Sequence, residues 1–144
     1  MSDEHLPTGP DPEAIKRTIL ERYPETVVAE AMGATFFSLD ESSWPNYATI
    51  VTTDEHDAEQ NSNLAARGAY RLNIGVGRQT FENLVDPTKT YDYTATDTIL
   101  PHPTYAKQLW LAIVNPTRER FDRQLQPLLD EAVQRLRRPT KPRS

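Results

Sequence analysis

Apolar and polar side chains alternate strictly over residues 70–76, and this pattern limits the possible folds of the chain. The apolar positions are Tyr70, Leu72, Ile74 and Val76, and the positions between them hold Arg71, Asn73 and Gly75. A period of two is typical of a β-strand, because successive side chains of a strand point to opposite faces of its sheet. The pattern therefore predicts a strand with one face in the core and the other face polar.

Four further segments have the composition of strands. Residues 26–30 and 35–39 are short, rich in β-branched and aromatic residues and separated by Gly33, which favours a hairpin. Residues 46–53 predict a third strand. There we expect Tyr47, Thr49 and Val51 to share one face, opposite Ala48, Ile50 and Thr52. Residues 109–114 form the last expected strand, so the sheet would have about five.

Helices are predicted at both ends and once in between. Asp11-Pro12-Glu13 has the residues of a helix start, and the helix would run to about Arg22. A second helix is expected at Arg78–Leu84. A long C-terminal helix would begin after Thr117 as its N-cap. Pro127 interrupts this helix, so the chain there either kinks or opens a second helix.

The order of the elements favours an α+β fold, with an antiparallel sheet of about five strands packed by the N-terminal helix and the long C-terminal helix. Residues 54–67 are expected to form a loop with one helical turn around Leu64, and residues 86–98 lack a period. We predict a disordered arm at 1–11, a single domain at 12–138 and a basic tail at 139–144.

Composition excludes several classes of protein. The 144 residues suit one domain, and the absence of cysteine removes thiolate chemistry and cysteine-ligated zinc. Hydrophobic residues make up 37% of the chain, and no apolar run approaches the roughly 20 residues that span a bilayer. The acidic N-terminus is unlike a signal peptide, so we expect a cytoplasmic protein without a membrane partner.

Charge is divided unevenly along the chain. Residues 1–60 hold 13 acidic and 3 basic side chains, net -10, whereas residues 61–144 hold 8 acidic and 13 basic, net +5. The basic C-terminal segment either attracts an anionic partner or is a solvated helix face followed by a tail. The acidic balance of the whole chain argues against nucleic acid as a partner, without excluding it.

Gly75-Val76-Gly77 lies between a strand and a helix, where phosphate-binding glycines occur in dinucleotide folds. The third glycine and the following βαβ unit are absent, which favours glycines that let a strand bend and end. Arg78, at the start of the next helix, is a candidate for binding an anion beside exposed amides.

Three histidines are present, and their spacing offers no metal site, so we expect neither a metal nor a cofactor. His102 has a fixed backbone, because it stands between Pro101 and Pro103. It is either an acid or base oriented by Asp97, or a hydrogen-bonded structural histidine. No serine lies in a nucleophile elbow, and the overall balance leans away from an enzyme.

A candidate ligand cleft follows from these patterns. Arg71 and Asn73 on the polar strand face would line it beside a proline-fixed aromatic segment, which contributes His102, Tyr105 and Trp110. With Arg78, these residues are the candidate ligand-binding set, and their charge suits a small anionic ligand. We therefore expect a ligand-binding or interaction module.

Several blocks of the chain carry a resemblance to a known family. They include "RLNIGV" at 71–76, "LPHPTY" at 100–105, the segment 46–54, Trp110 and Val114-Asn115-Pro116. Over about residues 12–138 the chain resembles domain of unknown function 6194, an uncharacterised bacterial family.

The end of the chain is also distantly similar to MmcQ/YjbR-like proteins. This likeness implies a compact α+β fold compared with a double-wing DNA-binding arrangement. Nucleic-acid binding of that type stays open beside the ligand-binding module, as does a small enzyme that uses His102 with Asp97.

Overall fold

The computed structural model describes residues 9–42, 44–53 and 63–137. Its helices are α1 (Pro12–Arg22), α2 (Leu64–Arg67), α3 (Arg78–Leu84), α4 (Arg118–Arg120) and α5 (Gln126–Arg137). Its strands are β1 (Val27–Ala31), β2 (Ala34–Ser38), β3 (Asn46–Val51), β4 (Arg71–Gly75), β5 (Leu100–Pro101) and β6 (Trp110–Val114). A 3₁₀ turn covers Ala106–Gln108. Residues 1–8 of the expected arm at 1–11, the expected tail at 139–144 and the acidic stretch 54–62 lie outside the described residues.

The strands form one sheet in the order β1-β2-β3-β4-β6-β5, and every neighbouring pair is antiparallel. The predicted α+β class is therefore confirmed. The sheet has six strands where the sequence predicted about five, because the two-residue strand β5 pairs with β6. The predicted hairpin forms β1 and β2, with Gly33 at φ 78° in the turn.

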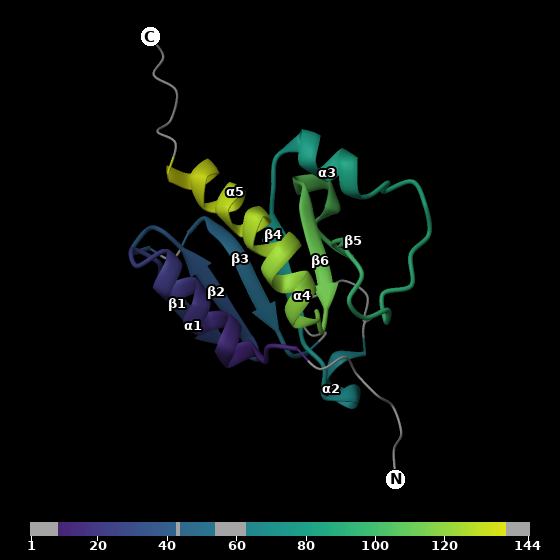
Figure 1. Ribbon diagram of the computed structural model, residues 1–144, viewed down its shortest axis with the longest axis horizontal. Coiled ribbons are helices and arrows are strands. Elements are labelled where there is room, and N and C mark those ends of the chain that lie inside the picture. Colours follow the sequence, from purple (N-terminus) through teal and green to yellow (C-terminus); the bar gives the residue numbers. More distant parts are fainter. Residues whose placement is uncertain (1–8, 43, 54–62, 138–144) are drawn as a thin grey trace.

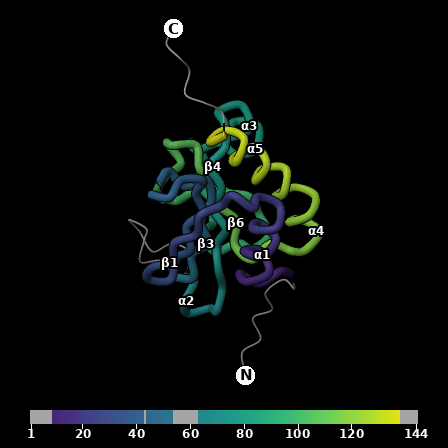
Figure 2. Tube along the Cα trace, turned by 90° about the vertical axis from the view of Figure 1, so that its left-hand side faces the viewer, coloured from purple at the N-terminus to yellow at the C-terminus, as the bar shows by residue number. Residues whose placement is uncertain are grey.

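Helices cover one face of this sheet. Figure 1 shows α1 and α5 crossing in front of the strands, and the turned view in Figure 2 places α1, α4 and α5 on the same side. Leu72 and Ile74 of β4 are almost fully buried on this side, in one cluster with Phe121 and Leu129 of the C-terminal helical segment. No helix among the described residues has the length and apolar character needed to cross a membrane.

A β-bulge in β3 changes which residues face the helices. Phe37 pairs with Ala48, but the next pair is Ser38 with Asn46, so β3 has one residue more than β2 at this point. Tyr47 and Ala48 consequently both belong to the core cluster. The expectation that Tyr47 shares a face with Thr49 is therefore wrong, because simple alternation cannot anticipate an extra residue.

Pro127 is the second residue of α5, close to the predicted alternative in which it opens a second helix. Thr117 caps the C-terminal helical segment as expected, since its hydroxyl accepts a hydrogen bond from the Arg120 amide. A π-helical turn, Phe121–Leu125, then joins α4 to α5. Proline has no N–H to donate, and a widened turn just before it absorbs the change in spacing. The helix thus continues past Pro127 to Arg137.

Polar contacts tie α1 to α5. Asp11 caps α1, accepting from the Ala14 amide at 2.8 Å. At the other end, Arg22 donates to both carboxylate oxygens of Asp130, at 2.8 and 3.0 Å, and the Tyr23 hydroxyl donates to the same carboxylate. Partial burial raises the pKa of Asp130, but the hydrogen bonds from Tyr23 and Arg22 outweigh it and hold the pKa below its usual value.

Replacement Asp130→Asn tests this link. The pKa of Asp130 is depressed in the folded protein, so its ionised carboxylate stabilises the fold. This stabilisation is fully present above the unfolded pKa of about 3.9 and is lost as pH falls through the folded pKa. The ion pair is nearly half exposed, so we expect Asp130→Asn to lower the free energy of unfolding by less than about 1 kcal/mol at pH 7. This difference should shrink toward pH 3. Urea unfolding at both pH values measures it.

The control is Asp122→Asn, which removes an exposed carboxylate paired with Arg118 at 3.6 Å within the helical segment. Its effect should be smaller than that of Asp130→Asn. An Asp130→Asn deficit that stays constant from pH 7 to pH 3 would show that the charge is not what links α1 to α5.

Candidate functional site

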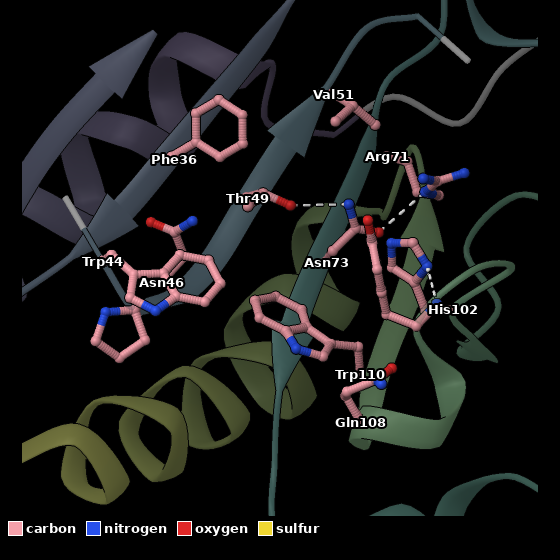
Figure 3. A pocket seen from close by; sticks show the side chains of 12 residues that line it. Phe36, Trp44, Asn46, Thr49, Val51, Arg71, Asn73, His102, Gln108 and Trp110 are labelled. Carbon is pink, nitrogen blue, oxygen red and sulfur yellow. Dashed lines mark hydrogen bonds between the residues drawn. The ribbon is translucent and has the colours of Figure 1, made fainter. Parts of the chain in front are cut away.

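A pocket of about 490 Å³ lies on the sheet face away from α1 and α5. We call it the sheet-face pocket. Its lining comes from β2, β3, β4 and β6, from the turn before β3 and from the segment between β5 and β6. The lining residues are Phe36, Trp44, Pro45, Asn46, Thr49, Val51, Arg71, Asn73, His102, Tyr105, Gln108 and Trp110. Figure 3 shows them from close by.

Five of the six candidate residues meet in this pocket. Arg71, Asn73, His102, Tyr105 and Trp110 all line it, although they lie up to 39 positions apart in the chain. Antiparallel pairing of β4 with β6 brings the two sets together.

Arg78 lies elsewhere. It lines a different surface hollow with Lys107, and its side chain is exposed and pairs with Glu82 at 3.7 Å. The amide of Gly77, expected to be exposed to an anion, donates instead to Glu131 Oε2 at 2.7 Å. A carboxylate of the chain itself thus occupies this position.

The polar face of β4 is buried. Arg71 and Asn73 are each only 1% exposed. Arg71 Nε donates to Asn73 Oδ1 at 2.9 Å, and Asn73 Nδ2 donates to Thr49 Oγ1, also at 2.9 Å. We call the group formed by Arg71, Asn73, Thr49 and His102 the polar floor of the pocket (Figure 3). The sequence predicted the face correctly as polar, and the structure shows that other segments cover it.

His102 is held as a neutral imidazole. Its Nδ1 accepts the amides of Thr104 and Tyr105, at 2.9 and 3.0 Å, so the ring proton belongs on Nε2. Burial, reinforced by the charge of Arg71, lowers the pKa of His102 to about 3. At neutral pH the ring therefore offers an N–H donor and carries no charge.

Asp97 does not orient His102. Its carboxylate accepts hydrogen bonds from the Thr117 amide and hydroxyl, at 2.8 and 3.1 Å, and from Arg120 Nε at 3.4 Å. These contacts place Asp97 at the start of α4. The alternative in which Asp97 orients His102 is therefore wrong, and the bonded Nδ1 of His102 fits the other alternative, a hydrogen-bonded structural histidine.

Gly75 makes room for Trp110. The two residues are direct partners across β4 and β6. A Cβ atom at position 75 would stand 3.2 Å from Cε2 and 3.3 Å from Cζ2 of the indole, closer than ordinary contact. The indole therefore lies against the bare backbone of Gly75, and Figure 3 shows it lying across β4.

Sequence reasoning missed the other half of the lining. Phe36, Trp44, Pro45, Asn46, Thr49, Val51 and Gln108 were not among the candidates, although they line the pocket. Thr49 could in principle have been predicted as a lining residue, because it pairs with Asn73 across β3 and β4. Asn46 was not, since only the bulge in β3 sets its position relative to Thr49.

Comparison with known proteins gives a family. The model of DUF6194, described as a family of unknown function, matches residues 10–144. The chain belongs to the DUF6194 family. The predicted resemblance to DUF6194 is thereby confirmed, and the matched range includes the whole sheet-face pocket.

No curated protein and no solved structure matches this DUF6194 chain. The likeness to MmcQ/YjbR-like proteins and the bacterial origin stay predictions. Within the described ranges, no three His, Asp or Glu side chains are grouped so that they could hold a metal ion.

The protonation of His102 makes a prediction for stability. Between about pH 3 and 6.5 the unfolded chain binds a proton at His102 that the folded DUF6194 protein does not, so stability falls as pH falls through this window. From pH 7 to pH 5 we expect a loss of about 2 kcal/mol attributable to this residue. Urea unfolding of the wild type and of His102→Asn, which keeps an acceptor, measures the difference.

His5 and His56 are present in both proteins and cancel in this comparison. If the wild type and His102→Asn lose the same stability from pH 7 to pH 5, His102 does not titrate with a depressed pKa.

Proposed function

We propose that this DUF6194 protein binds a small organic anion in the sheet-face pocket. The observation that carries the proposal is a pocket of about 490 Å³, walled mostly by apolar and aromatic side chains, with the Arg71 guanidinium in its polar floor. Pockets of roughly 300 to 1,000 Å³ with apolar walls and a few convergent polar groups are typical of small-molecule sites.

Electrostatics favour an anion over a neutral or cationic ligand. Arg71 carries a positive charge beside His102, and this charge helps to lower the pKa of the imidazole. No Asp or Glu stands among the described residues of the lining. The guanidinium and the Nε2–H of His102 are both donors, which suits the oxygens of an anionic group.

Nucleic acid as the partner has less support. Four arginines of the basic C-terminal segment already face carboxylates of the chain, in the pairs Arg118–Asp122, Arg120–Asp97, Arg123–Glu119 and Arg137–Glu25. These contacts reduce the positive potential that phosphates would need. Arg138, Lys141 and Arg143 lie outside the described residues.

An enzyme using His102 also has less support. An imidazole with a pKa near 3 is a weak base at pH 7, and its Nδ1 is already bonded to the backbone. We therefore keep binding, rather than catalysis, as the proposed function, and we keep the cytoplasmic location as a prediction.

Naphthalene-2-carboxylate and the uncharged naphthalene-2-carboxamide test the charge preference. The two probes have nearly the same shape, so we expect the carboxylate to bind at least about tenfold more tightly, as for a hydrogen bond to a charged group. Isothermal titration calorimetry and the ligand-induced rise in melting temperature measure both affinities. Arg71→Met should remove the preference, and Arg71→Lys should keep part of it.

Arg78→Met is the matched control, because it removes an exposed arginine outside the pocket. Circular dichroism shows which variants remain folded. Equal affinity of the two probes for the wild type would overturn the proposal, as would tight carboxylate binding that folded Arg71→Met retains.

A further inference from the structure

We infer that the anion is a flat, unsaturated ring system with a single carboxylate, its ring lying against Trp110 and its carboxylate directed to the polar floor. This inference rests on the proposed function and goes further, because it names the chemical class of the ligand. Three observations carry it.

The first observation is the seat of Trp110. The indole lies on the backbone of Gly75, where a Cβ would approach it to 3.2 Å. The backbone of Gly75 thus packs against one face of the indole and holds the orientation of its plane. Trp110 also lines the pocket. A fixed aromatic surface prefers a flat π-system to a puckered saturated ring of equal size.

The second observation is the exposure of aromatic side chains around the pocket. Among the described residues, three large apolar side chains are prominently exposed: Met32 (72%), Trp44 (70%) and Tyr105 (48%). Trp44 and Tyr105 both line the sheet-face pocket, yet they come from segments 61 residues apart. Exposed aromatic surface gathered at one hollow marks a place where an apolar ligand becomes buried.

Phe36 and Trp44 stand toward one side of the pocket and Trp110 toward the other, with the polar floor beyond them (Figure 3). A ring placed among these side chains has aromatic neighbours on more than one side. The volume of about 490 Å³ accommodates a two-ring compound.

The third observation concerns the anionic group. Arg71 is 1% exposed and His102 is 5% exposed, so the polar floor presents little donor surface to a ligand. A phosphate brings up to two charges and three strong acceptor oxygens, all of which must lose their water. A carboxylate has two oxygens and one charge and suits a floor with few donors.

Saturation of the ring system tests the inference. Naphthalene-2-carboxylate and trans-decahydronaphthalene-2-carboxylate share a carbon skeleton and a charge, and only the first is flat. We expect the flat compound to bind about three- to tenfold more tightly by calorimetry. Trp110→Leu should remove the preference. Gly75→Ala, which pushes on the indole, should reduce it in a protein that stays folded. Met32→Ala, which changes an exposed side chain outside the pocket lining, should leave it unchanged.

A spectroscopic readout locates the ring. The chain has two tryptophans, so Trp44→Phe leaves Trp110 as the single source of an indole N–H signal in a nitrogen–proton spectrum. Naphthalene-2-carboxylate should shift this signal by its ring current. An unchanged signal at saturating ligand would overturn the stacking on Trp110.

The remaining outcomes separate the two proposals. Equal affinity for the flat and saturated carboxylates overturns the aromatic class and leaves anion binding intact. Tighter binding of 2-naphthyl phosphate than of the carboxylate overturns the choice of anionic group. Binding of neither carboxylate, or equal binding of the neutral carboxamide, overturns the proposed function itself.

Discussion

The amide of Asn73 is the interaction on which the site depends. Its oxygen accepts from Arg71 and its nitrogen donates to Thr49, so both ends of one side chain are engaged. Buried polar groups are costly unless they are bonded, and here the bonds also connect β4 to β3 beyond the backbone ladder. The amide thereby gives the guanidinium a defined direction in the middle of a sheet.

The two faces of β4 contribute to different parts of the structure. Leu72 and Ile74 belong to the core beneath the helices, and Arg71 and Asn73 belong to the pocket on the far side. A shift of one residue in the pairing would exchange these sets and place a guanidinium against α5. The hydrophobic core therefore selects the register that also assembles the polar floor.

Local sequence patterns predicted part of this arrangement. The alternation over residues 70–76 identified β4 and its two faces, and the prolines around His102 marked a fixed segment beside Trp110. The bulge that redirects Tyr47 and the π-turn before Pro127 were not predicted, because each depends on packing against elements distant in the sequence. Phe36 and Trp44 were missed for a similar reason, since membership of a pocket depends on which strands become neighbours.

The strand order has a consequence for how occupancy relates to folding. The pocket gathers side chains from Phe36 to Trp110, contributed by four adjacent strands and two connecting segments. No contiguous stretch of the chain holds more than a part of it. A bound molecule would consequently contact several adjacent strands of the sheet at once. Its binding free energy would therefore oppose global unfolding rather than the local unfolding of a single loop.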